Sequence, residues 1–281
     1  MLTTRHGVRV LAAADLDEFL ALAERDPVVN VFAIHRAQTT SLEPRWLGGE
    51  MWGRFEGGEL VAACHVAANL VPIQAGPEDA VVFAERALAR RRTASTIVGP
   101  QDAVLPFWNA INGAWGRPRD ARWDQRHLVI ECDPDIEPDP AVRVTARTDL
   151  DTLYPACVSM YTEEVGVSPE IGGGSELYRT RVLQLIGRGW SFARFDRGEL
   201  VFKAEVACAT PNAAQIQGVW VPPHRRGEGL ASAGMAAVVA LVRARISPSV
   251  SLYVNEWNEP ARRAYERVGF RETSRFATVM F

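Results

Sequence analysis

Residues that bind metals or form disulfides are scarce in this sequence. Its 281 residues include only four cysteines and five histidines. The cysteines show no C-x-x-C spacing and the histidines no H-x-x-x-H pair, so neither a zinc site nor a disulfide framework is predicted. We therefore expect free thiols, as in cytoplasmic proteins, and chemistry that uses no metal.

The sequence also lacks a long apolar run and a strong excess of one charge. Its longest strongly apolar stretch, residues 230–242, is too short to span a bilayer. Acidic residues interrupt the apolar region near the N-terminus, which therefore does not resemble a signal peptide. A net charge of −3 gives no reason to expect nucleic acid as a partner. We expect a cytoplasmic globular protein that binds neither nucleic acid nor membrane.

Two segments of the sequence are each followed later by a similar segment, and the two copies keep the same order. VRVLAAADLDEFL at residues 8–20 returns as VRVTARTDLDTLY at 142–154, and RFEGGELVAA at 54–63 returns as RFDRGELVFK at 194–203. The second pair is typical of a β-hairpin with a glycine-containing turn. Two matched landmarks in one order indicate an internal duplication. The Pro- and Asp-rich residues 132–141 between the copies predict a linker.

The second half alternates between strand and helix patterns. Helices are predicted at residues 150–162 and 176–186, and strands at 142–146, 190–195, 199–209 and 250–255. We expect two short closing strands between the last helix and the C-terminal residue, Phe281.

Residues 215–242 predict a strand, a glycine loop and a buried helix. The loop contains Gly227 and Gly229, which let the backbone turn without Cβ clashes and aim successive N–H groups at one point. That point faces the positive end of the helix dipole, so the geometry suits a pyrophosphate. The loop lacks the Lys-Ser/Thr of a Walker loop and the third glycine of a dinucleotide fingerprint.

Two motifs carry a family resemblance. Arg226, Gly229 and Ala231 fit Arg/Gln-x-x-Gly-x-Gly/Ala, so this loop resembles the pyrophosphate loop of the GNAT acyltransferases, which bind acetyl-CoA. Residues 251–270 predict a strand, a turn and a helix, and they fit the family's Asn-x-x-Ala-x-x-x-Tyr-x-x-x-Gly-Phe motif. The matching residues of this second motif are Asn258 at the predicted N-cap, Ala261, Tyr265, Gly269 and Phe270.

The whole chain resembles tandem GNAT proteins of actinobacterial type. This implies an α/β fold of two tandem domains, each a central, mostly antiparallel mixed sheet flanked by helices. We expect a degenerate domain of unknown function without a cofactor site at residues 1–134, a linker at 135–141, and an acyl-CoA-binding domain at 142–281. In the first copy, Glu78 and Asp79 at the helix start would occupy the N–H groups that a pyrophosphate needs and would repel it.

The resemblance also implies roles for individual residues. The amides of Val219 and Val221 would stabilise the oxyanion of the thioester, and Tyr265 would protonate the departing thiolate. Glu205, Glu163 and Glu164 all stay open as the general base. For Glu205 the alternative is an ion pair with Lys203 or an arginine, and for the other two it is solvated surface charge. Contacts with the cofactor are expected from Val219, Trp220, Val221, Arg225, Arg226, Gly227, Glu228, Gly229, Leu230, Ala231, Asn255, Asn258, Ala261 and Tyr265.

The function expected from the resemblance is an N-acyltransferase that transfers acetyl from acetyl-CoA, its cosubstrate, to a primary amine by direct attack. The acceptor would be a small molecule or a peptide. A non-catalytic acyl-CoA-binding regulatory module and a mycothiol-synthase-like acetyltransferase are the alternatives. Because the duplication mimics a dimer, we expect either a monomer that is a pseudo-dimer or a homodimer.

Overall fold

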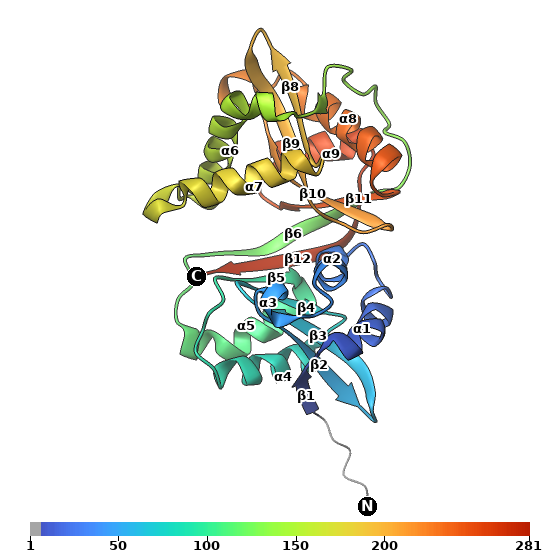
Figure 1. Cartoon of the computed structure of the whole chain (residues 1–281), viewed down its shortest axis with the longest axis vertical. Helices are drawn as coiled ribbons and strands as arrows, with labels where there is room; N and C mark the ends of the chain where they lie inside the picture. Colours follow the sequence, from blue (N-terminus) through green and yellow to red (C-terminus); the bar gives the residue numbers. More distant parts are fainter. Residues whose placement is uncertain (1–6) are drawn as a thin grey trace, which may run out of the picture. The chain divides into compact units, whose positions relative to one another are not determined.

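The computed structural model describes residues 7–281, which divide into two compact units. The first contains the chain up to Leu128 together with Tyr253–Trp257 and Glu272–Phe281, and the second contains Val129–Leu252 and Asn258–Arg271. Each unit is a mixed sheet flanked by helices, which confirms the predicted fold class (Figure 1). The limits predicted from the duplication, 1–134 and 142–281, stay a prediction.

The first unit contains a sheet in which β4 and β5 run parallel and β12 lies antiparallel to β5. Its strands, in spatial order, are β1 (Gly7–Val10), β2 (Glu50–Glu56), β3 (Glu59–Val66), β4 (Asn69–Ile73), β5 (Thr96–Pro100), β12 (Arg271–Met280) and β6 (Asp120–Ile130).

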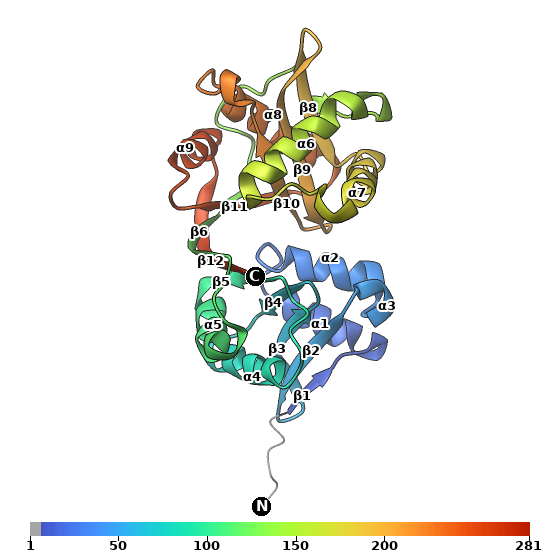
Figure 2. The same ribbon diagram turned by 90° about the vertical axis from the view of Figure 1, so that its left-hand side faces the viewer.

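Neighbouring residues of β2 show how the two faces of this sheet are covered. Side chains alternate along a strand, so Met51 and Trp52 are buried on opposite faces. Met51 packs with residues of α1, α2 and α3, whereas Trp52 packs with residues of α4 and α5 (Figures 1 and 2). These helices are α1 (Leu16–Ala23), α2 (Val31–Thr40), α3 (Pro44–Leu47), α4 (Pro77–Leu88) and α5 (Gln101–Trp115).

The second unit has a sheet in which β10 and β11 are parallel and the other neighbours are antiparallel. Its strands, in spatial order, are β11 (Ser249–Asn255, of which residues 249–252 belong to this unit), β10 (Ala213–Trp220), β9 (Glu199–Ala209), β8 (Ser191–Asp196) and β7 (Arg143–Val144).

Two pairs of helices cover the faces of this second sheet (Figure 2). Leu153 of α6 (Leu150–Val165) and Val182 of α7 (Ser175–Gly187) pack with Ala193 and Leu200 of the sheet. On the other face, a Cβ at Gly234 of α8 would lie 2.8 Å from the ring of Phe202, so glycine lets this helix approach β9 closely. The two helices of this second pair are α8 (Leu230–Arg245) and α9 (Glu259–Val268).

The duplication appears in local geometry as well as in sequence. Arg9 and Asp15 form a bidentate pair at 2.7 Å, and Arg143 and Asp149 form the same pair at 2.7 and 2.8 Å. Both aspartates lie in short 3-10 helices, η1 (Ala13–Asp15) and η2 (Arg147–Asp149). Each hairpin also has a register shift at the same step, Arg54/Phe55 in the first copy and Arg194/Phe195 in the second. Equivalent residues therefore build equivalent turns.

The prediction of two short closing strands is wrong, because the chain ends in the single strand β12. Residues 271–280 contain no glycine, proline, asparagine or aspartate that would start a turn, so the strand continues without a break. Residues 276–280 pair with residues 96–100 of β5. Across residues 7–281, no helix combines the length and apolarity needed to cross a membrane. The four cysteines are free thiols.

Candidate functional site

The two parallel strands at the centre of the second unit diverge along their length. β10 and β11 pair from Ala213↔Ser249 to Gln215↔Ser251, and within the described part of the chain the pairing stops there. Beyond this point β10 presents main-chain groups at an unpaired edge, where an extended ligand bearing amide groups can add its own hydrogen bonds.

A bulge in β10 lies beside this opening. The register with β9 shifts between Gln217 and Trp220, and Gly218 has a left-handed φ of +61°. Lys203 Nζ donates a 2.9 Å hydrogen bond to the carbonyl oxygen of Gly218. In a trans peptide the C=O and the next N–H point in opposite directions, so the Val219 N–H is directed away from Lys203.

Lys203 and Glu205 form a buried polar cluster beneath the bulge. Lys203 is fully buried and Glu205 is 6% exposed. Glu205 Oε2 lies 3.3 Å from Lys203 Nζ, and Glu205 Oε1 accepts a 2.8 Å hydrogen bond from Gln217 Nε2. Burial lowers the pKa of Lys203, but the charge of Glu205, the hydrogen bond with it and the nearby Cys157 together raise the pKa, so the ammonium stays charged. Glu205 thus adopts the ion pair that was its alternative to a base.

The glycine loop precedes α8, as predicted. After the short helix η4 (Pro223–Arg225), Gly227 and Gly229 have φ values of +85° and +81°, and a Cβ at either position would meet no atom within 4 Å. The N–H groups of residues 227–232 donate no hydrogen bond to any described residue. The loop therefore presents a row of open main-chain donors at the positive end of a buried 16-residue helix.

The two arginines of the loop are held by carboxylates. Arg225 Nε lies 3.0 Å from both carboxylate oxygens of Glu228, and its Nη1 lies 3.3 Å from Asp196. Arg226 Nη2 donates to both oxygens of Glu163 at 2.7 and 2.8 Å, and its Nε donates to the carbonyl of residue 221. Main-chain amides rather than guanidinium groups are thus the open donors of the loop.

Glu163 contacts both the glycine loop and β10. Besides the pair with Arg226, it accepts a 3.1 Å hydrogen bond from Trp220 Nε1. The carboxylate and the guanidinium are each about half exposed, at 49% and 47%. Both oxygens of Glu163 are therefore engaged, which disfavours a role as the base.

Tyr265 projects from α9, whose start is capped as predicted. Asn258 Oδ1 accepts a 3.3 Å hydrogen bond from the Ala261 N–H, and Gly269 ends the helix with a φ of +112°. Tyr265 is 7% exposed, and its hydroxyl forms no hydrogen bond with the described residues. Burial raises the pKa of Tyr265, and the charge of Glu164 raises it further. Tyr265 is therefore a neutral donor at ordinary pH, with Glu164 close enough to affect it.

Two known families match parts of this chain. Residues 184–270, which include the glycine loop and Tyr265, match the model of the acetyltransferase (GNAT) family. By this match, residues 184–270 form a GNAT-family domain. Residues 49–153 match a family described as a domain of unknown function, DUF4081. No curated protein gives a significant match to the chain.

Solved structures share the tandem fold across nearly the whole chain. A GCN5-related N-acetyltransferase from Sphaerobacter thermophilus is 19% identical, with a TM-score of 0.63 over 99% of this chain and 96% of that one. A GNAT-family acetyltransferase from Colwellia psychrerythraea is 13% identical, with a TM-score of 0.60 over 98% and 99%. A tandem GNAT protein from the clavulanic acid biosynthesis pathway is 17% identical, with a TM-score of 0.56 over 98% of both chains. At these identities the likeness shows the fold.

One predicted cofactor residue, Asn255, already has a side-chain partner, and its contact with the cofactor stays a prediction. Asn255 belongs to the first unit, where its Oδ1 accepts a 3.0 Å hydrogen bond from Gln125. Sequence reasoning missed the part played by Gly218. Its signal was a glycine in the middle of a β-branched run, which often marks a bulge. Lys203 in the apolar segment VFKAEV was noticed only as a partner for Glu205.

Proposed function

We propose that the GNAT domain transfers an acyl group, acetyl in the simplest case, from acyl-CoA to a primary amine by direct attack. The observation that carries this proposal is the open row of N–H groups at residues 227–232, beside the diverging edge of β10. Amides at the start of a helix bind a diphosphate, and an unpaired strand edge suits the amide groups of a pantetheine arm. The four free thiols agree with action in a reducing compartment such as the cytoplasm.

Different residues of the site would stabilise the oxyanion and protonate the leaving group in such a transfer. The amine nitrogen attacks the thioester carbonyl, negative charge develops on the carbonyl oxygen, and the C–S bond then breaks. The Val219 N–H, directed away from Lys203, would stabilise that oxyanion. Tyr265, with its unpartnered hydroxyl, would protonate the leaving thiolate.

The remaining proton must leave the attacking amine. Both oxygens of Glu205 and of Glu163 already have partners. Glu164 is the predicted carboxylate whose charge acts on Tyr265. We assign the proton acceptor to Glu164 because its charge reaches Tyr265, the proposed acid, and it would act directly or through water.

Titration calorimetry with acetyl-CoA tests the proposal. Gly229→Ala places a Cβ at the open cradle and should weaken binding by about tenfold or more. Gly57→Ala is the matched control, because Gly57 also has a left-handed φ, +60°, and open space around it. Equal binding by both variants would contradict the cradle. Release of CoA with a panel of amines separates an enzyme from a binding module, since the module would bind acetyl-CoA and release no CoA.

A further inference from the structure

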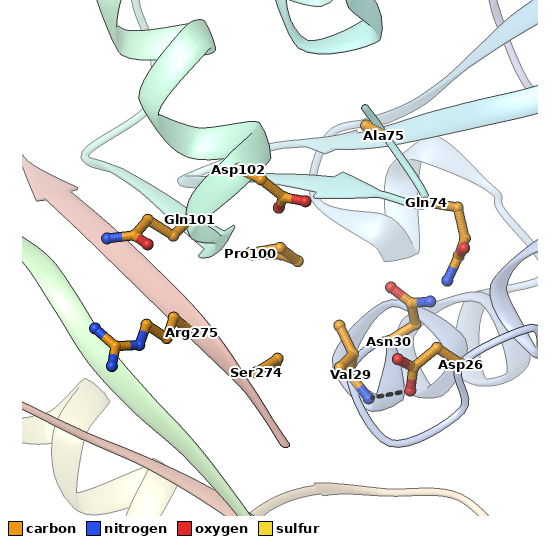
Figure 3. A pocket seen from close by; sticks show the side chains of 10 residues that line it. All are labelled: Asp26, Val29, Asn30, Gln74, Ala75, Pro100, Gln101, Asp102, Ser274 and Arg275. Atoms are coloured by element: carbon orange, nitrogen blue, oxygen red, sulfur yellow. Dashed lines mark hydrogen bonds between the residues drawn. The ribbon is translucent and has the colours of Figure 1, made fainter. Parts of the chain in front are cut away.

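The first unit contains a pocket of its own, with a volume of about 340 Å³ (Figure 3). Every residue that lines it belongs to that unit: Asp26, Val29, Asn30, Gln74, Ala75, Pro100, Gln101, Asp102, Ser274 and Arg275. The volume lies in the range of pockets that bind small molecules.

The pocket lies where β4 and β5 diverge. These parallel strands pair at Asn69↔Thr96 and Leu70↔Ile97, and the pairing of the described residues stops there. Residues 74 and 75, just beyond β4, and Pro100, which ends β5, line the pocket. The GNAT domain has the same divergence between β10 and β11. Duplication has therefore placed a cavity at the corresponding point of the first unit.

This cavity does not have the chemistry of a diphosphate site. The N–H of Gly76, at the start of α4, donates a 2.8 Å hydrogen bond to Asp79 Oδ2. Asp79 is in turn paired with Arg54. The helix start is thus occupied by Asp79, one of the two carboxylates predicted there, and a second anion would be repelled.

The inner wall of the pocket presents hydrogen-bond acceptors. Asn30 is 96% buried and its Nδ2 donates a 2.9 Å hydrogen bond to the carbonyl of residue 23, whereas its Oδ1 accepts none from the described residues and points into the pocket (Figure 3). The carboxylate of Asp102 is directed to the same space and has no cationic partner within residues 7–281. Ser274 Oγ is also buried, and it has no hydrogen-bond partner among residues 7–281.

The cationic and amide groups on the opposite side are turned away. Arg275 Nη1 lies 2.8 Å from Asp124 and its Nε lies 3.2 Å from Glu272, so its charge is neutralised outside the cavity. The side-chain amide of Gln101 donates a 2.7 Å hydrogen bond to the carbonyl of residue 123. In Figure 3 both side chains point away from the centre of the pocket. The space is therefore left with carboxylates at its rim and an amide oxygen within it.

We propose that this pocket binds a small molecule that carries a protonated primary amine together with amide or hydroxyl groups. The ammonium would lie between Asp102 and the Asn30 Oδ1, and Asp26, which keeps one oxygen beyond its bond to the Val29 N–H, adds negative charge. Charge-assisted hydrogen bonds of this kind are the strongest that the wall offers. The Ser274 hydroxyl would serve the neutral polar groups. This site does not depend on acyl transfer by the GNAT domain.

Calorimetry on the full chain tests the proposal with two matched probes, N-acetyl-lysinamide and N-acetyl-norleucinamide, which differ in the terminal ammonium. The lysine probe should bind at least about tenfold more tightly than its norleucine analogue. Asp102→Asn should lower the affinity for the lysine probe about fivefold or more. Asp17→Asn is the control, because Asp17 is likewise an exposed first-turn aspartate, on α1, and it should leave the affinity unchanged.

Gln74→Gly provides a second variant that keeps the fold. Gln74 has a left-handed φ of +49°, which glycine adopts without a Cβ penalty, so thermal stability should be kept while the amide facing the pocket is lost. Weaker binding of the lysine probe at unchanged melting temperature supports the site. The proposal is overturned if the lysine probe does not bind, if both probes bind equally, or if Asp102→Asn and Asp17→Asn behave alike.

Discussion

The ammonium nitrogen of Lys203 lies 2.9 Å from the carbonyl oxygen of Gly218, at the bulge of the central strand. The lysine is fully buried and its charge is balanced by Glu205. This contact fixes the direction of the peptide group that precedes Val219. A residue remote from the predicted motifs therefore orients the amide proposed to stabilise the oxyanion.

Replacing the lysine should cost both stability and turnover. Lys203→Met leaves Glu205 buried without its cation, and removal of one partner of a buried pair costs about 3–5 kcal/mol. The double variant Lys203→Met, Glu205→Leu removes both charges and should recover much of that loss. Urea unfolding of the two variants measures the difference. If the single variant is as stable as the double one, the pair is not coupled as the contacts indicate.

Glu163→Gln should have little effect. The Glu163–Arg226 pair is about half exposed, and such pairs contribute about 0–1 kcal/mol to stability. Because both oxygens already accept hydrogen bonds, turnover should change by less than about threefold. Glu164→Gln is the paired variant and should lower turnover by about a hundredfold. Steady-state rates that rank the two variants in the opposite order would move the base to Glu163.

Tyr265→Phe should lower turnover and spare binding of acetyl-CoA. A general acid contributes about 10²- to 10⁴-fold, and the raised pKa of Tyr265 makes this proton harder to give up, so we expect a loss near the lower end. The raised pKa also keeps the hydroxyl protonated well above pH 10, so the rate should show no alkaline decline from this group below that pH. A pH–rate profile that falls near pH 9 in wild type and not in Tyr265→Phe would contradict this.

The first unit should lose stability in mild acid. Burial lowers the pKa of His65 and of His127 to about 4, against about 6.5 for an exposed histidine. The unfolded chain therefore binds protons first, and the free energy of unfolding should fall as the pH drops from about 6.5 to about 4. The largest loss is about 3 kcal/mol for each histidine. Urea titrations at pH 5 and 7 should show a smaller pH dependence for His127→Gln, whereas an unchanged dependence would mean that His127 does not cause it.

Sequence reasoning reached the parts of the site that local chemistry determines. The Gly227 and Gly229 turns and the Asn258 cap depend on backbone conformations that few residue types allow, so these features can be recognised from the sequence alone. The role of Glu205 was left open, because a carboxylate in an apolar strand can be either a general base or a member of an ion pair, and the sequence does not distinguish the two. Only the fold brings Gln217 within hydrogen-bonding distance of the second carboxylate oxygen of Glu205.

The chain's long-range connections were beyond this reasoning. β6 has an irregular mixture of polar and apolar residues because several of its polar side chains have partners on distant segments. Gln125, for example, hydrogen-bonds to Asn255 and Thr278. No local sequence pattern indicates such long-range pairs. Neither β6 nor the grouping of β12 with the first unit could therefore be predicted.

Amide hydrogen exchange of the full chain, with and without CoA, tests the central claim most directly. If the diphosphate is held by main-chain amides at the start of α8, saturation with CoA should slow exchange at residues 227–232, whose N–H groups have no acceptor among the described residues. Exchange at residues 74–80, ahead of α4 in the first unit, should stay unchanged. Protection of residues 74–80 with none at 227–232 would contradict the account.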